Sequence, residues 1–265
     1  MMTSQSLKFR HGSLFSGIGG FDLAAEWMGW TNVFHCELNP FGRKILKHHF
    51  PDSTSYEDIT KTDFSIYRGE LDILTGGFPC QPFSLAGKRK STEDERYLWH
   101  EMLRAVQEIK PKFVIAENVY GIVNIDGGLV FEAVCADLEA EGYEVTPFIL
   151  PACAKNAPHI RARIWFIANS SEQGRKRGPQ YGGFEGGRTE RNQLTTRLLQ
   201  PEWEKFPTEP PICSRNDGLS ERLDGITFPK WRNESIKSYG NAIVPAVAHE
   251  LFKAINTLHY GNDEK

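Results

Sequence analysis

The chain has 265 residues, of which 40% are hydrophobic and 25% are charged, and its formal net charge is −3. This is the composition of an ordinary globular protein with room for one catalytic domain and a small appendage, and the charge alone does not indicate a nucleic-acid partner. It has no run of about 18 apolar residues, and its N-terminal segment is too polar for a signal peptide, so we expect a cytoplasmic protein that does not span a membrane.

Short β-rich segments alternate with helical patterns through the first 170 residues. Strands are expected at residues 11–15, 31–37, 71–77, 112–118, 143–150 and 163–169, and helices at 20–30, 40–50, 96–109 and 129–142. In the last of these helices, Val130, Val134 and Leu138 recur at helical spacing, and Gly142 is a suitable stop. The alternation predicts an α/β fold with a mostly parallel sheet covered by helices on both faces.

This alternation ends after Asn169. Residues 170–193 are rich in glycine and charge, and a proline-rich stretch follows at 201–213. We expect either a small irregular domain or a flexible insertion there, and then an amphipathic helix at 244–258 with Pro245 in its first turn. The predicted organisation is a main domain of residues 1–169 and 235–265, interrupted by a small region at 170–234.

Positive charge is concentrated in one part of the chain. Between Lys155 and Arg197, nine Lys or Arg stand against three Glu, a net charge of +6, which leaves −9 for the rest. A second basic group occupies residues 88–90. These charges fit a strip that follows a phosphate backbone, and they also fit a solvated basic loop.

A glycine-rich turn, LFSGIGGF, lies where the first predicted strand meets the first helix. Glu37 follows Gly17 by 20 residues and ends the second strand, where an acid binds ribose hydroxyls in nucleotide-type folds. The glycine spacing is not G-x-G-x-x-G, so a phosphate-free adenosyl ligand fits better than a dinucleotide. Asp58, near the next strand end, could accept from an adenine amino group. A purely structural turn is the alternative.

Cys80 lies in the segment GGFPCQPFS, directly after the strand predicted at 71–77. Loops at the carboxyl ends of parallel strands face the ligand crevice, and Pro79 and Pro82 stiffen the chain on both sides of the cysteine. Its thiolate would be a strong nucleophile, although a lone cysteine is also a common buried apolar residue. The five cysteines are odd in number and never spaced as CxxC, which argues against disulfides and a zinc site, and we expect no metal.

Three further charged residues are candidates for the chemistry. Glu117 closes an otherwise uncharged strand, where a carboxyl with a raised pKa could hold a proton, although a solvated acid is the alternative. Arg161 and Arg163 are two residues apart at the start of a strand and should project from one face. Such a pair suits a carbonyl and a phosphate, or forms surface ion pairs.

Taken together and in this order, these segments resemble the DNA cytosine-5 methyltransferase family of bacterial or phage type. The corresponding segments are FSGIGGF, the acid Glu37, GFPCQPFS with the nucleophile, ENV, RAR and YGNAIVP. The resemblance covers residues 12–168 and about 238–258. It implies a Rossmann-like S-adenosylmethionine-dependent methyltransferase sheet, with a small irregular target-recognition region at 170–234.

The resemblance also implies an activity: transfer of a methyl group from S-adenosylmethionine to C5 of a flipped-out cytosine in a short duplex DNA sequence. Cys80 would form a covalent adduct with C6, and Glu117 would hold and protonate N3. Arg163 would support the cytosine carbonyl, while Arg161 would stabilise neighbouring protein or phosphate groups. Where the family commonly has Pro-Gln before the arginines, this chain has Pro158-His159.

The remaining site assignments also follow from the resemblance. The cofactor residues would be Phe15, Gly17, Ile18, Gly19, Gly20, Glu37, Leu38, Asp58, Ile59, Pro79 and Asn241. The DNA-binding residues would be Gln81, Ser84, Lys88, Arg89, Arg175, Lys176 and Arg177. Double-stranded DNA is the expected partner of a monomer, with a cognate restriction endonuclease left open.

Three alternatives differ in substrate or chemistry. A branch of the same family methylates cytosine in transfer RNA, against which the basic insertion argues. A nucleotide-binding oxidoreductase would need the third glycine that the turn lacks. A non-catalytic DNA-binding relative would not need the full set of reacting residue types that this chain has.

Overall fold

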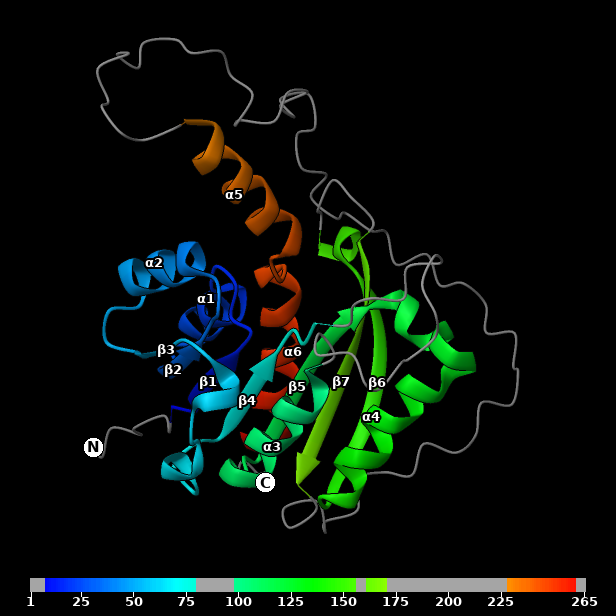
Figure 1. Ribbon diagram of the computed structural model, residues 1–265. Helices are drawn as coiled ribbons and strands as arrows, with labels where there is room; N and C mark the ends of the chain where they lie inside the picture. The colour runs from blue at the N-terminus through cyan, green and yellow to red at the C-terminus, as the bar shows by residue number, and fades with distance from the viewer. Residues whose placement is uncertain (1–7, 80–97, 156–160, 171–227, 261–265) are drawn as a thin grey trace, which may run out of the picture.

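The computed structural model describes residues 8–79, 98–155, 161–170 and 228–260 (Figure 1). Seven strands form one sheet in the order β3-β2-β1-β4-β5-β7-β6, and β7 runs antiparallel to both its neighbours. The strands are β1 (Arg10–Leu14), β2 (Thr31–Cys36), β3 (Thr54–Tyr56), β4 (Ile73–Gly76), β5 (Phe113–Val119), β6 (Tyr143–Pro151) and β7 (Ala162–Ser170). The predicted α/β fold is confirmed, and of the strands in the described residues only the three-residue β3 was not predicted.

Helices cover both faces of this sheet (Figure 1). They are α1 (Gly20–Trp27), α2 (Pro40–His49), α3 (Trp99–Ile109), α4 (Leu129–Ala140), α5 (Phe228–Asn241) and α6 (Pro245–Tyr260). Short 3₁₀ segments are η1 (Ile59–Lys61), η2 (Ser65–Tyr67), η3 (Tyr120–Gly128) and η4 (Ala152–Lys155). None of the described helices has the length and apolarity needed to cross a bilayer.

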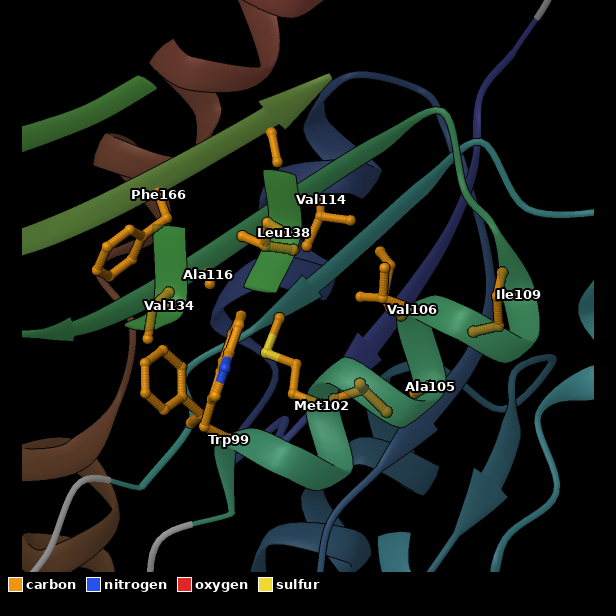
Figure 2. Packing of buried hydrophobic residues seen from close by; sticks show 14 of the residues in the cluster. Trp99, Met102, Ala105, Val106, Ile109, Val114, Ala116, Val134, Leu138 and Phe166 are labelled. Atoms are coloured by element: carbon orange, nitrogen blue, oxygen red, sulfur yellow. The ribbon is translucent and has the colours of Figure 1, made fainter. Parts of the chain in front are cut away.

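One face of the sheet packs against α3 and α4, as Figure 2 shows. Val134 and Leu138 of α4 are fully buried there, as their helical spacing predicted. The indole nitrogen of Trp99 donates to Asp137 Oδ2 at 2.8 Å and so joins the two helices. Two amphipathic helices therefore fix the positions of β4, β5 and β7 from this side.

The opposite face packs against α1 and α6. Phe252 of α6 stacks on Trp30 with ring centroids 4.6 Å apart, and Phe21 of α1 meets Trp165 of β7 edge to face at 5.9 Å. Six of the thirteen buried residues in this layer are Phe or Trp, whose large rings bury more surface than aliphatic side chains do. Because of this packing, the C-terminal helix returns to lie beside the first helix of the chain (Figure 1).

Helix α5 begins at Phe228, within the region predicted to be irregular. Trp231, Ile236 and Tyr239 are exposed on it, so its apolar residues do not form one buried stripe. Helix prediction from hydrophobic periodicity depends on such a stripe, which explains why this helix was missed. The division into a main domain and a region at 170–234 stays a prediction.

Candidate functional site

Apart from Asn241, which ends α5, the predicted site residues that the structure describes lie along one edge of the sheet. The carboxyl ends of the adjacent strands β3, β2, β1, β4 and β5 form this edge, and β7 begins there because it is antiparallel. The segment after β1 contains Phe15, Gly17, Ile18, Gly19 and Gly20, the segment after β2 contains Glu37 and Leu38, and the segment after β3 contains Asp58 and Ile59. Pro79 follows β4, Glu117 is in β5, and the start of β7 carries Arg161 and Arg163. In parallel sheets this edge carries the ligand crevice.

The glycine turn joins β1 to α1 through a left-handed backbone. Phe15 and Gly17 have φ angles of 52° and 58°, a region that glycine enters without strain. A side chain at Gly17 would meet no described atom within 4 Å, so open space lies over the turn there. The first helix has Gly19 as its N-cap and no side-chain cap, which suits a ligand carboxylate at the α1 N-terminus.

Glu37 is fixed beside this turn by backbone donors. Its Oε2 accepts from the Gly17 amide at 2.6 Å, and its Oε1 accepts from the Asn39 amide at 2.7 Å. Burial raises the pKa of Glu37, while these two bonds and Arg43 oppose the rise. Each oxygen keeps a second lone pair, so the carboxylate could still accept from ligand hydroxyls.

Asp58 is arranged differently from Glu37. Its Oδ1 accepts from the Thr60 amide at 3.0 Å and its Oδ2 pairs with Lys61 at 3.0 Å, so the carboxylate caps η1. The hydrogen bonds from Thr60 keep the pKa of Asp58 below its usual value. Apolar surface is also present at this end, where Leu38 is 64% exposed and Ile59 is buried. An acid beside apolar side chains suits an adenine ring.

Glu117 lies near the end of β5 and is only 8% exposed. The Nε of Arg163 approaches its Oε1 at 3.2 Å. Arg163 pairs with Val119 in the antiparallel register, so it reaches Glu117 diagonally on the same face. Burial raises the pKa of Glu117 to about 7, against the opposing charges of Arg163 and Arg161. This carboxyl can therefore hold a proton near neutral pH.

Arg161 binds a different group. Its Nη1 donates to the Gly240 carbonyl and its Nη2 to the Ala242 carbonyl, both at 2.7 Å. The two arginines are thus close together, but one faces a carboxylate and the other faces backbone oxygens. Asn241, which was predicted to close the cofactor pocket, is exposed between the two bound carbonyls.

The start of the cysteine segment is tied to the end of β5. Asn118 Nδ2 donates to the Phe78 carbonyl at 2.9 Å, two residues before Cys80. Cys80 itself lies outside the described residues, as do the predicted DNA-binding residues Gln81, Ser84, Lys88, Arg89, Arg175, Lys176 and Arg177. Cys36 is the described cysteine nearest the turn, and burial raises the pKa of its thiol to about 12. A thiol so hard to ionise is a poor nucleophile.

Sequence reasoning missed a buried polar network under the glycine turn. Ser13 Oγ donates to the fully buried Asp22 carboxylate at 2.9 Å and lies 2.7 Å from Ser16 Oγ. The Cys36 amide donates to Ser16 Oγ at 3.1 Å, which joins β1 to β2. An acid in the first turn of α1 was the available signal, but acids are common there for electrostatic reasons.

The sequence of the chain is similar to those of known proteins. The profile of the C-5 cytosine-specific DNA methylase family matches residues 9–209. The Type II methyltransferase M.Eco47II of Escherichia coli is 39% identical over 158 residues, which cover 58% of this chain and 38% of that protein. The orphan methyltransferase M.SPRI of Bacillus phage SPR is 34% identical over 165 residues, or 60% and 37%. The match thus spans well under half the length of these relatives.

Solved structures show the same fold. A protein of E. coli, described as a DNA modification methyltransferase encoded within a prophage, superposes with a TM-score of 0.54 at 28% identity, over 62% of this chain and 47% of that one. The Dnmt2 methyltransferase of S. pombe gives a TM-score of 0.52 at 24% identity, over 62% and 51%. At that identity, the second similarity is evidence of fold alone.

Proposed function

The chain belongs to the C-5 cytosine-specific DNA methylase family, and on this premise we propose that it methylates C5 of cytosine in duplex DNA. The observation that carries the proposal is the environment of Glu117. Its carboxyl is almost excluded from water, and this burial raises its pKa to about 7. It lies beside Arg163, and its strand is next to the one that leads to Cys80. General acids work best when their pKa lies near the working pH.

Glu117 and Arg163 supply what the cytosine ring needs. C5 of cytosine is a weak nucleophile until a thiolate adds at C6, and the added electrons then collect on the N3 side of the ring. Glu117 donates its proton to N3 and so neutralises that charge, while Arg163 supports the adjacent carbonyl oxygen. A buried acid paired with a cation performs both tasks with little reorganisation.

Cys80 supplies the thiolate in this proposal. It follows Pro79 directly, and the bond from Asn118 holds the Phe78 carbonyl just before it. After methyl transfer, loss of the C5 proton and β-elimination release Cys80. Because the ring must be reached from both faces, the cytosine leaves the duplex, and the predicted DNA-binding residues and the region at 170–234 serve that step.

S-adenosylmethionine fits the loops at the ends of β1, β2 and β3. The open space over Gly17 and the uncapped α1 N-terminus suit its amino-acid group, and Glu37 suits its ribose. The exposed side chain of Leu38 offers apolar contact to the adenine, whereas Ile59, next to Asp58 in the chain, is buried in the core. When bound, this cofactor supplies an electrophilic methyl group. The chain's part is to orient it toward the cytosine and to exclude water.

The test is expression in a bacterium that lacks DNA methylation, followed by bisulfite sequencing of the host DNA. We expect unconverted cytosines in one short recurring motif, and complete conversion with Cys80→Ala. Cys153→Ala is the matched control, because Cys153 is an exposed free thiol in η4, after β6, and β5 and β7 lie between β6 and the strand that leads to Cys80. Complete conversion with the wild-type protein, when it is folded and binds S-adenosylmethionine, would reject DNA as the substrate, and transfer RNA would be assayed next.

A further inference from the structure

Residues 240–244 contain the last two residues of α5 and the link to α6, and we call this segment the elbow. Helix α5 ends at Asn241, and α6 starts at Pro245. The last carbonyls of a helix have no partner within the helix. Arg161 satisfies two such groups at once, the carbonyls of Gly240 and Ala242, at 2.7 Å each.

Arg161 is itself held in an unusual conformation. Its φ angle is 36°, in the left-handed region that residues with a side chain rarely adopt. Strain of this kind persists where surrounding contacts impose it and often marks functional sites. The two bonds to the elbow are contacts of that kind, so the start of β7 and the elbow hold each other in place.

Ile243, in the middle of the elbow, lies against the start of α1. The Cβ of any side chain at Gly20 would lie 2.6 Å from the Ile243 carbonyl oxygen and 2.8 Å from its Cβ. Real Cβ contacts are not that short, so only glycine permits the elbow to approach α1 this closely. The first residue of α1 and the elbow are therefore in direct contact beside the glycine turn.

The side chain of Ile243 also reaches the start of the cysteine segment. A Cβ at Gly77 would meet Ile243 Cδ1 at 3.3 Å and Glu117 Oε2 at 3.4 Å. The isoleucine methyl and the carboxyl oxygen thus face the same side of Gly77. Glu117 is 8% exposed, and Ile243 packs against the apolar layer that includes α1 and α6.

We propose that Ile243 is a positioning residue that shields the carboxyl of Glu117 from water and holds the glycine turn against the cysteine segment, in a position set by Arg161. The inference rests on the proposed function, since Glu117 is taken as the proton donor. It assigns the elbow a role that the motif resemblance did not, because Ile243 acts here on the acid rather than on the cofactor.

A separate contact joins α5 to the segment that holds Glu37. Asn39 Nδ2 lies 3.5 Å from Glu234 Oε2 of α5, and the Asn39 amide donates to Glu37.

The experiment measures the titration of Glu117 in the protein without DNA. Carbon-13 NMR of glutamate-labelled protein reports the midpoint, and the spectrum of Glu117→Gln assigns the signal. Ile243→Val removes the Cδ1 that faces Gly77, and Ile243→Ala removes more. We expect the midpoint to fall by about half a pH unit and about one unit respectively, because water reaches the carboxylate and stabilises it.

Ile255→Val is the matched control, since Ile255 is buried in α6 within the same apolar layer and away from Glu117. It should lower the melting temperature and leave the midpoint unchanged. Arg161→Lys keeps the charge but loses the two-carbonyl geometry, so it should lower the midpoint as Ile243→Val does. An unchanged midpoint in both Ile243 variants would overturn the proposal.

A second measurement separates this inference from the proposed function. If the chain methylates DNA, the falling alkaline limb of its kcat/KM profile should move to lower pH in Ile243→Val by the same amount as the titration midpoint. If the wild-type chain methylates nothing, the proposed function fails, and the NMR midpoint still decides whether Ile243 shields Glu117.

Discussion

The two ends of the site each hold a carboxyl, half-buried Glu37 and buried Glu117, in different ways. At the glycine turn, two backbone amides donate to Glu37 at 2.6 and 2.7 Å. At the β5–β7 end, the guanidinium of Arg163 lies 3.2 Å from Glu117. Burial raises the pKa of both acids, but at Glu37 the hydrogen bonds are the main opposing effect, and at Glu117 the arginine charges are.

This difference indicates what each carboxyl can do. Fixed amide donors favour the charged form and lock its orientation, so Glu37 is suited to accept hydrogen bonds from a bound ligand. Burial beside the guanidinium of Arg163 leaves Glu117 able to carry a proton and to release it without leaving an unpaired backbone donor. One acid is thus suited to binding and the other to proton transfer.

The largest effect should come from Glu117→Gln. The amide cannot donate the proton that N3 needs, so the methylation rate should fall by at least about 100-fold. Binding of S-adenosylhomocysteine, followed by calorimetry, should change little, because Glu37 and the glycine turn are untouched. Glu144→Gln, an exposed acid on β6, is the control and should keep full activity. A fully active Glu117→Gln enzyme would show that the acid is not the proton donor.

Glu37→Gln should produce the opposite pattern. The new amide group would point one N–H toward the Gly17 or Asn39 amide, and leaving one such donor unpaired costs about 1–3 kcal/mol. We expect the dissociation constant of S-adenosylhomocysteine to rise roughly tenfold or more. The methylation rate at saturating cofactor should fall much less. Glu57→Gln is the control, since Glu57 is exposed and pairs only with Arg43 among the contacts described. Equal losses in binding and rate would contradict the division of roles.

The sequence predicted these two acids but not how they are held. Glu37 and Glu117 were found because they end strands, and strand ends are visible in local patterns. The contacts that hold them join separate parts of the chain: the Gly17 amide donates to Glu37 across 20 residues, and Arg163 of β7 pairs with Glu117 of β5. No local period encodes such pairs.

The structure also shows which groups Arg161 binds and brings Ile243 to the site. Arg161 was expected to bind either protein or phosphate groups, and the structure places it on protein carbonyls. Ile243 was not singled out, because an apolar residue in a short link has no periodic partner to reveal its packing. Residues that act through close contact, as Gly20 and Gly77 do with Ile243, are visible only in three dimensions.

The smallest effect concerns stability and extends the comparison to a third acid, Asp22. Burial raises the pKa of Asp22 to about 7, so its contribution to stability is full below its ordinary pKa of 3.8 and is lost as the pH rises through 7. Burial lowers the pKa of His11 to about 4, so its contribution is full above its ordinary 6.5 and is lost as the pH falls toward 4. Between about pH 4 and 6.5, the free energy of unfolding therefore falls with rising pH because of Asp22 and rises with pH because of His11, so the two dependences oppose each other.

Asp22→Asn removes the pH dependence of stability that comes from Asp22 and leaves the one that comes from His11. The variant should lose about 1–2 kcal/mol more than the wild type when the pH falls from about 6.5 to 5, because the unopposed His11 must take up a proton on unfolding. Urea unfolding at several pH values measures this slope, and a uniform loss of stability from the new amide does not affect it. Asp52→Asn, an exposed acid, should leave the slope unchanged. If Asp22→Asn and the wild type lose stability in parallel, Asp22 is ionised throughout, and the Ser13 hydrogen bonds rather than burial set its charge.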